Sequence, residues 1–527
     1  MKYKPFFRML IVLSAATLLA GTVGVSASAA TIDPDELIAA ESVAETATQN
    51  DLPTSYNSAA LGYITPVKNQ QFNDCWAYSA MGTLESKLLR MGIATDDMSV
   101  PHINMWATTR SNGKGWIRSI SEPAYCSTAP GYLTAWQGGV WERDAQDISL
   151  NWDIKGDEMP TDRARFGVTS LRYVSRNNPD EIKRAIMENG GVTTGYSHNG
   201  IYMQSSISYF MPSSYSDHLS GHQIEVIGWD DNYSKNNFNV TPNNNGAWLC
   251  KNSWGNNNTL GGLFWISYED KYIFSSKYQP SFAIEQLEKV TQNKKLIQNE
   301  IYGATYEFDY IQENELTFVN RFHFNKSYAL LDKVIFETRV ANASYELYLV
   351  PEQSGAPSND ESSWKFLNKG ITDYAGYICV DINNVLLEDS TASIAVKLKS
   401  NDRNITIGVD EWLNSSTDLR YLFLNESEYG MSYIYQNGKM TDLMDWYNDV
   451  NHDSIGGTFI IKALTLKPET GDVNLDGKID INDVTLIQQY LAEFVTLNDS
   501  QRLLADVNHD NKVDITDATA LQIIIAS

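Results

Sequence analysis

The chain is poor in cysteine, with only Cys75, Cys126, Cys250 and Cys379 among 527 residues. Four cysteines are too few to hold a chain of this length in a disulfide scaffold. The simplest interpretation of the last three is that they are small, buried apolar residues. Hydrophobic cores must therefore stabilise the fold, and the length predicts two to four domains.

Basic residues are also scarce relative to acidic ones. The chain has 40 Lys and Arg against 65 Asp and Glu, a formal net charge of −25 at pH 7. Such an excess of negative charge disfavours nucleic acid as a partner. It suits a soluble secreted protein and one that binds cations.

Long apolar runs are missing after the first twenty residues, so no later segment is expected to cross a bilayer. Three basic residues precede an apolar run over 9–20, and small residues follow, ending Ala27-Ser28-Ala29-Ala30. This order is typical of a secretory signal with an Ala-x-Ala cleavage site. The alternative is a retained membrane anchor, for which the run is short. We predict a removed signal peptide over 1–30 and a leader or linker over 31–50.

Three distant segments carry the candidate chemistry. Cys75 begins an expected helix with apolar residues every four positions, and Gly92 is its expected end. His222 precedes an apolar strand that ends in Gly-Trp, and Asn252 lies in Lys-Asn-Ser-Trp-Gly. A Cys, a distant His and then an Asn is the order of a thiol nucleophile, its base and the group that orients the base.

The expected chemistry starts from the thiol, which is mostly protonated near neutrality and must become a thiolate. The helix N-terminus and His222 would favour the thiolate of Cys75, and the ring would later protonate the leaving amine. Asn252 would accept the other ring N–H, and Trp254 would cover that bond from water. The Cys75 backbone N–H and an upstream side-chain amide would stabilise the oxyanion.

The region from about Leu52 to Tyr268 resembles a papain-like cysteine peptidase of the C1 family. The resemblance rests on Pro-Val-Lys-Asn-Gln before Cys-Trp-Ala-Tyr-Ser, and on the His and Asn segments in this order. It implies an endopeptidase that forms an acyl-enzyme thioester, with Cys75 as nucleophile, His222 as base and acid, and Asn252 orienting the ring. It implies no cofactor for catalysis.

The chain departs from this family just before the nucleophile. Phe72-Asn73-Asp74 replaces the usual Cys-Gly pair and is one residue shorter. Gln70 is the implied oxyanion amide, and Gln71 remains an alternative. Asp74 would oppose thiolate formation unless it caps the helix and points away. His218 is a rival base, but no apolar strand follows it.

The C-terminal segment is an internal repeat in which residues 471–483 recur 34 positions later as 505–517. Both copies place oxygen-bearing side chains at positions 1, 3, 5, 9 and 12 of a loop. These are Asp472, Asn474, Asp476, Asp480 and Asp483 in the first copy and Asp506, Asn508, Asp510, Asp514 and Asp517 in the second. Calcium prefers several oxygen ligands on a sharply turned loop, so two calcium ions are predicted. Gly477 stands at the first turn, and Asn511, which also tolerates the left-handed conformation, at the second.

This repeat resembles a dockerin from Gly471 to the C-terminus. An apolar-patterned helix is expected after each loop, none before it, and Asp rather than Glu holds position 12, unlike an ordinary EF-hand. The resemblance implies docking to a cohesin domain of a scaffoldin. It places the contacts at Ile481-Asn482 and Ile515-Thr516, and the duplication allows two orientations.

The stretch from about Phe282 to Leu466 has many short β-rich runs between turns, for example 333–338, 345–350 and 458–461. Such spacing predicts a β-sandwich. It resembles the lectin-like β-domain that follows bacterial peptidases of this type. The resemblance suggests carbohydrate as a further partner, and the alternative is a structural domain packed against the peptidase.

The sequence thus predicts an α+β protein with a two-lobed papain-like domain over 51–280, a lectin-like β-sandwich over 281–466 and a small all-α dockerin over 467–527. The predicted function is a secreted cysteine endopeptidase that cleaves proteins or peptides, held outside the cell in a cell-surface or free cellulosome, an assembly for polysaccharide breakdown. Two alternatives remain open. One is a non-catalytic binding or adhesion subunit of the same assembly, and the other is a transferase using the same thioester.

Overall fold

The computed structural model describes residues 52–93, 95, 97–109, 115–116, 118–146, 163–215, 220–275, 280–300, 302–324, 330–387, 390–413, 423–424, 428–450 and 454–527. The predicted signal peptide and leader, and the rival base His218, lie outside these residues. Within them, no helix has both the length and the apolar character needed to span a membrane.

The longest helix of the N-terminal region, 52–289, begins at Cys75. The helices there are α2 (Cys75–Arg90), α3 (Val100–Trp106), α4 (Thr128–Thr134) and α5 (Pro179–Asn189). The predicted apolar repeat of α2 is confirmed by the burial of Trp76, Ala80, Leu84 and Leu88. Gly92 adopts φ +79° just after the helix, a left-handed conformation that favours glycine and ends the helix as predicted.

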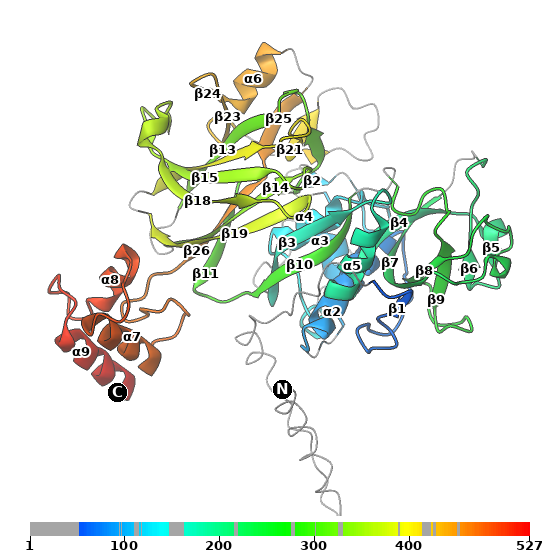
Figure 1. The fold of residues 1–527 in the computed structure, drawn as a ribbon, viewed down its shortest axis with the longest axis horizontal. Coiled ribbons are helices and arrows are strands. Elements are labelled where there is room, and N and C mark those ends of the chain that lie inside the picture. Colours follow the sequence, from blue (N-terminus) through cyan, green and yellow to red (C-terminus); the bar gives the residue numbers. More distant parts are fainter. Residues whose placement is uncertain are drawn as a thin grey trace, which may run out of the picture. The chain divides into compact units, whose positions relative to one another are not determined.

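The strands of the N-terminal region bring the His and Asn segments together. They include β1 (Ser55–Asn57), β3 (Phe166–Val174), β4 (Val192–His198), β7 (Ser220–Asp230), β8 (Ala247–Lys251), β9 (Leu263–Ser267) and β10 (Ser281–Lys289). Strand β7 pairs with β4 on one side and β8 on the other, and α2 packs against β7 (Figure 1). Since Glu225 pairs with Lys251, His222 near the start of β7 lies close to the residues that follow β8.

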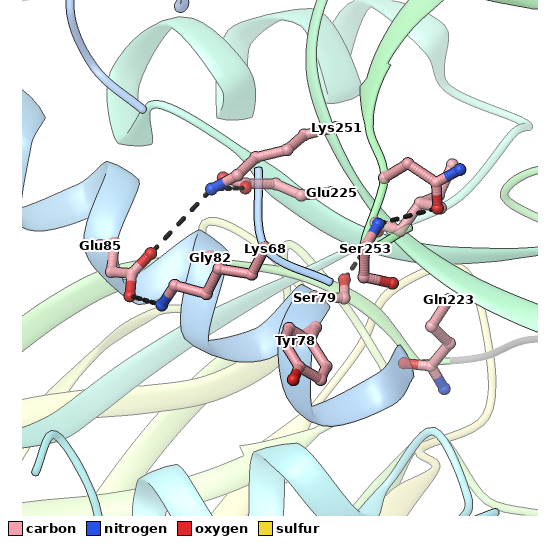
Figure 2. A pocket seen from close by; sticks show the side chains of 11 residues that line it. Lys68, Tyr78, Ser79, Gly82, Glu85, Gln223, Glu225, Lys251 and Ser253 are labelled. Atoms are coloured by element: carbon pink, nitrogen blue, oxygen red, sulfur yellow. Dashed lines mark hydrogen bonds and ion pairs between the residues drawn. The ribbon is translucent and has the colours of Figure 1, made fainter. Parts of the chain in front are cut away.

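A buried ion cluster joins α2 to these strands (Figure 2). The Lys251 ammonium lies 3.4 Å from a Glu225 oxygen and 4.0 Å from Glu85, and it donates to the Thr65 hydroxyl at 3.0 Å. Lys68 completes the cluster at 2.6 Å from the other Glu85 oxygen. Burial raises the pKa of Glu225, and the charge of Lys251 opposes that rise. Because Asn252 follows Lys251 directly, the cluster anchors the chain at the candidate site.

Replacing Lys251 by methionine should destabilise the N-terminal region by about 3–5 kcal/mol, because the buried Glu225 carboxylate loses its cation while Glu85 keeps only Lys68. Urea denaturation followed by tryptophan fluorescence measures the loss. The matched control is Lys235→Met, which removes a surface ammonium that donates to the Asn243 carbonyl. A second change, Glu225→Gln, should restore part of the stability of the Lys251 variant. A loss below about 1 kcal/mol would show that the carboxylates do not depend on Lys251.

The middle region, 294–466, is built from two facing sheets, as the β-rich runs predict. The six-stranded sheet of the described residues has the order β18 (Lys365–Ile371), β15 (Ser344–Val350), β20 (Thr391–Lys399), β13 (Glu315–His323), β23 (Ser432–Gln436) and β24 (Lys439–Asp442). Facing it are β11 (Lys294–Gln298), β26 (Ile461–Leu466), β14 (Leu330–Thr338) and β19 (Gly376–Leu386). Other elements are β12 (Tyr306–Phe308), β21 (Ile407–Leu413), β25 (Ser454–Phe459) and α6 (Leu443–Asp449).

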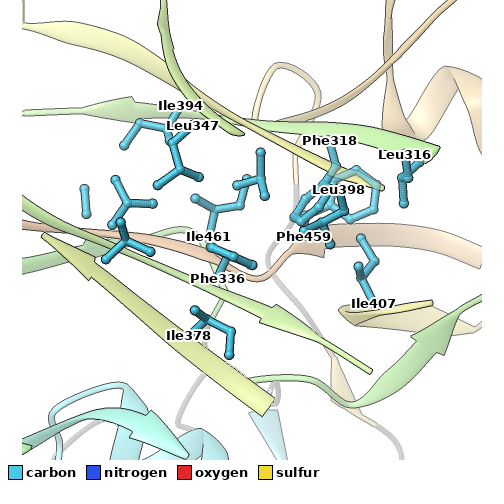
Figure 3. Close-up of a cluster of buried hydrophobic side chains, with 14 of the residues drawn as sticks. Leu316, Phe318, Phe336, Leu347, Ile378, Ile394, Leu398, Ile407, Phe459 and Ile461 are labelled. Atoms are coloured by element: carbon cyan, nitrogen blue, oxygen red, sulfur yellow. The ribbon is translucent and has the colours of Figure 1, made fainter. Parts of the chain in front are cut away.

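A hydrophobic core fills the space between these sheets (Figure 3). Phe318 and Ile394 enter it from the six-stranded sheet, and Phe336 and Ile461 enter it from the opposite side. All four side chains are fully buried. At about 25 cal/mol per Å² of apolar surface, burial of such side chains is the main stabilising term of the region.

One strand pairing was not foreseen from the sequence. Strand β19 of the middle region pairs with β3 of the N-terminal region, through Gly376 opposite Arg172 and Tyr377 opposite Leu171. The two regions thereby share one continuous sheet. No local sequence pattern predicts this pairing, because about two hundred residues separate the two strands along the chain.

The C-terminal region, 467–527, contains α7 (Ile481–Leu491), α8 (Asp499–Ala505) and α9 (Ile515–Ala526). Helices α7 and α9 follow the two acidic loops, as predicted. The expectation that no helix precedes either loop is wrong for the second, because α8 ends directly before Asp506. Its signal was present in the sequence: Asn498 and Gln501 form a capping box.

Candidate active site

Cys75 lies at the N-terminus of α2, where the first backbone N–H groups have no partner within the helix. The Asp74 carbonyl accepts hydrogen bonds from Ala77 and Tyr78 and so begins the helix. The helix dipole at this end favours a negative charge on the sulfur. The side chain of Asp74 makes no capping hydrogen bond, so the capping that would spare the thiolate its charge is absent.

His222 is held in β7 between a hydrogen bond and an aromatic ring. Its Nε2 lies 2.9 Å from Asn252 Oδ1, and because the amide oxygen only accepts, Nε2 carries the proton. The ring of Trp254 stacks on the imidazole, with centroids 4.4 Å apart and planes at 23°. His222 is 5% exposed. Trp254 thus covers the imidazole, as its position after Asn252 suggested.

The residue after His222 connects this strand to the thiol. The backbone N–H of Gln223 donates to Cys75 Sγ at 3.4 Å, across 148 positions of sequence. The fold therefore brings the Cys, His and Asn segments into one place. Sequence reasoning missed Gln223, and it treated Cys126 as a simple buried residue. The Gln223 side chain donates to Cys126 Sγ at 3.0 Å, so this second thiol lies beside the first.

All four cysteines are free, and Cys250 is fully buried as expected. Cys126 and Cys379 are only partly buried, which corrects the expectation for these two. For Cys379 strand alternation carried the signal, because Ile378 and Val380 on either side of it point into the core.

The two candidate oxyanion amides differ in how they are held. Gln70 Oε1 accepts from the Ser253 hydroxyl at 2.5 Å, and its Nε2 donates to the Phe72 carbonyl at 2.7 Å. Its backbone N–H also donates to the Ser253 carbonyl at 2.7 Å. Gln71 is exposed, and its side-chain amide reaches only the Asn69 carbonyl at 3.4 Å. Gln70 is therefore the amide held by hydrogen bonds between Phe72, shortly before Cys75, and Ser253, directly after Asn252.

Burial shifts the pKa values of the thiol and the imidazole in opposite directions. It raises the pKa of Cys75 to about 11, with the charge of Asp74 adding to the rise, and lowers the pKa of His222 to about 4. Each shift by itself favours the uncharged group. A thiolate and an imidazolium form together when the proton moves from sulfur to ring, because the two charges then stabilise each other.

A cavity of about 620 Å³ lies beside Asn252 and Trp254. Its wall includes Asn252 and Trp254, the two residues that hold His222, together with His198 and the amides of Asn257 and Asn258. It is large enough to receive peptide side chains.

The two acidic loops of the C-terminal region share several internal hydrogen bonds. Asp483 accepts from the backbone N–H groups of Val473 and Asn474, and Asp517 accepts from those of Val507 and Asn508. Each carboxylate, at the end of its loop, thus holds the backbone at the start of the same loop. This equivalence follows from the sequence repeat.

The conformations at the two turns agree as well. Gly477 and Asn511 adopt φ +82° and +66°. The prediction that Asn511 takes the left-handed conformation in place of glycine is confirmed.

The donors of the first loop fit a cation. Asp472 Oδ1 is buried without a hydrogen-bond partner, and burial raises the pKa of this carboxyl to about 6, with the charges of Asp483 and Asp476 adding to the rise. Throughout the described part of the chain, no three His, Cys, Asp or Glu side chains are grouped to hold a metal by themselves. A calcium ion would therefore also need Asn474 and backbone carbonyls.

Comparisons with known proteins agree with this geometry. Family models match the papain family cysteine protease over residues 52–284, the lectin like domain over 296–465 and the dockerin type I domain over 470–525. A structure of the clostridial cysteine protease Cwp84 after propeptide cleavage is 34% identical, with a TM-score of 0.68, covering 78% of this chain and 99% of that chain. The chain belongs to the papain family of cysteine proteases.

A second structure contains the cysteine protease and lectin-like domains of Cwp84, a surface layer associated protein of Clostridium difficile. It is 34% identical with a TM-score of 0.68, and covers 79% of this papain-family chain and 89% of that chain. Human cathepsin L2 is 28% identical over 222 residues, 39% of this chain and 58% of its own. Mouse procathepsin L is 27% identical over 232 residues, 41% of this chain and 60% of its own. This chain thus spans about three-fifths of these two relatives.

The predicted resemblance and fold class are therefore confirmed: a papain-like peptidase fold, a lectin-like β-rich domain and a helical dockerin form an α+β protein.

Proposed function

We propose that this chain is a cysteine endopeptidase in which Cys75, His222, Asn252 and Gln70 carry the reaction. The observation that supports it most is the convergence at the N-terminus of α2. There the N–H of Gln223 contacts the sulfur while the adjacent His222 ring is held by Asn252. Proteins or peptides are the substrates that this family membership implies.

The proposed reaction follows from the hydrogen bonds. With Nε2 donating to Asn252, Nδ1 of His222 is the ring atom that takes the proton from Cys75. The sulfur then bonds to the scissile carbonyl carbon. The Cys75 backbone N–H and one N–H of the Gln70 side-chain amide donate hydrogen bonds to the resulting oxyanion. The other N–H of that amide donates to the Phe72 carbonyl.

The intermediate collapses when the carbon–nitrogen bond breaks. His222 returns its proton to the leaving amine, and a thioester remains on Cys75. Water then attacks this thioester, with the same imidazole accepting the proton of the water. The acyl group leaves as a carboxylic acid, and the thiol is restored.

The C-terminal region is proposed to be a calcium-loaded dockerin, with one ion in each loop. The ten predicted ligands in the two loops would share these ions with backbone carbonyls. Ile481 and Ile515 occupy equivalent positions and are 58% and 60% exposed. Two matched apolar residues suit docking to a cohesin domain in either orientation. We place the protein outside the cell, in a cellulosome, after removal of a signal peptide at 1–30.

The domain boundaries of 51–280, 281–466 and 467–527 are part of this proposal. Carbohydrate binding by the middle domain also belongs to it. The lectin-like family match over residues 296–465 supports this class of ligand.

Incubation of the full chain with a peptidyl epoxide, which traps active-site thiolates, tests the enzymatic proposal. We expect one adduct per chain, on the tryptic peptide that contains Cys75, as located by mass spectrometry. Labelling should be lost in His222→Ala and retained in His323→Ala, a change at an exposed histidine of β13. No adduct on Cys75 would favour the alternative of a non-catalytic binding subunit.

A further inference from the structure

Asp74, the charged residue next to the nucleophile, is buried in the fold. It is 3% exposed. Its Oδ1 accepts from the backbone N–H of Phe72 at 3.4 Å, and its Oδ2 accepts from the side-chain amide of Asn104 at 3.3 Å. Burial raises the pKa of this carboxyl, and the charge of Arg118 opposes the rise. A buried charge in this position needs compensation.

Arg118 supplies a buried guanidinium at the same place. It is 6% exposed, and its centre lies 5.4 Å from the ring of Trp76, the residue after the nucleophile. Its nitrogens donate to the backbone carbonyls of Asn104, Ala107 and Glu122 at 3.0, 2.8 and 2.6 Å. Three carbonyls and one ring thus fix the cation.

The side chain of Asn104 connects this cation to the carboxylate. Arg118 donates to Asn104 Oδ1 at 2.7 Å, while Asn104 Nδ2 donates to Asp74. The guanidinium can only donate, so it fixes which end of the amide faces Asp74. The amide is therefore oriented with its positive end on the carboxylate.

We propose that Arg118 is a positioning residue that acts through Asn104: it holds the Asp74 carboxylate in a fixed, charge-compensated place and so limits its repulsion of the Cys75 thiolate. This inference rests on the proposed role of Cys75. It explains how the chain keeps an acidic residue where the family usually has a small neutral one.

The other ionisable groups around this cluster do not replace Arg118. Glu122 faces the guanidinium, but its carboxylate accepts from the Ser119 N–H at 2.6 Å. Burial raises the pKa of the Tyr78 hydroxyl to about 12, and the charge of Asp74 adds to the rise. Cys126 interacts with the Cys75 thiol, and its side chain accepts a hydrogen bond from Gln223 at 3.0 Å. Among these groups only Arg118 brings a positive charge at neutral pH, since burial lowers the pKa of its guanidinium only to about 10, with the charges of Glu122 and Asp74 opposing that fall.

The test is the pH dependence of Cys75 alkylation by iodoacetamide in the full chain, followed on the Cys75 peptide by mass spectrometry. We expect Arg118→Met to raise the midpoint by about one pH unit, because Asp74 loses its compensation. Asp74→Asn should lower the midpoint. In the Asp74→Asn background, Arg118→Met should cause no further shift of the midpoint. With Asp74 present, Arg118→Lys should give a midpoint between those of the wild type and Arg118→Met.

Arg90→Met is the matched control, since Arg90 ends the same helix and packs on Tyr63. It should leave the midpoint unchanged. An unchanged or lowered midpoint in Arg118→Met would overturn the proposal, as would an equal shift with and without Asp74. If Arg118→Met fails to fold, Asn104→Ala breaks the same bridge and should raise the midpoint by a smaller amount. Alkylation does not need peptide hydrolysis, so an inactive protein with these shifts would refute only the enzymatic proposal.

Discussion

Replacing Cys75 by alanine should abolish peptide hydrolysis, with kcat falling by about four to six orders of magnitude. The sulfur forms the bond to the substrate in the proposed reaction, and the neighbouring Cys126 thiol accepts a hydrogen bond from the Gln223 side chain. Cleavage of an unstructured protein substrate, followed by mass spectrometry of the fragments, measures the loss. The same assay with an added amine would reveal a transferase through amide products.

Cys379→Ala is the matched control, because this free thiol lies in β19 of the middle region. It should retain full activity, and both variants should bind calcium as the wild type does. Hydrolysis at the wild-type rate by Cys75→Ala would refute the assignment of the nucleophile. It would leave the proposed dockerin untouched, since the acidic loops share no residue with the site.

Removal of calcium should unfold the C-terminal region and abolish cohesin binding, while hydrolysis continues. The buried oxygen of Asp472 has no hydrogen-bond partner, and burial together with the charges of Asp483 and Asp476 raises the pKa of its carboxyl. A cation would offset this cost, and its binding free energy would become folding free energy. Circular dichroism with and without a chelator should show the loss of the helices after the loops.

Single substitutions sharpen this test. Asp472→Ala should weaken calcium binding in the first loop on the order of a hundredfold, as measured by calorimetry. Asp499→Ala is the matched control, since this exposed residue of α8 pairs with Arg502 outside both loops. Equal calcium affinity in the two variants, or cohesin binding that survives chelation, would contradict the proposed role of the loops.

Several helices and turns of this protein could be predicted from local sequence. The helix after Cys75, its end at Gly92 and the helices after each acidic loop were predicted correctly. So was the left-handed turn at Asn511. These features depend on residues within one or two turns of each other, where apolar spacing and backbone preference decide the conformation.

The order Cys75, His222, Asn252 was also readable, because each residue stands in its own short motif. What the motifs lacked was the geometry around them. Gln223 contacts the thiol across 148 positions, and Lys251 meets Glu85 from another strand. Neither contact has a local signature.

The sequence by itself determined the three families of domain, the candidate nucleophile and the paired loops. Only the tertiary structure decided that β19 extends the sheet of the first region, and that a bridge from Arg118 through Asn104 reaches Asp74. The physical reason is that backbone preferences and apolar periodicity act over a few residues. Ion pairs, side-chain bridges and sheet edges depend instead on which distant surfaces meet when the cores form.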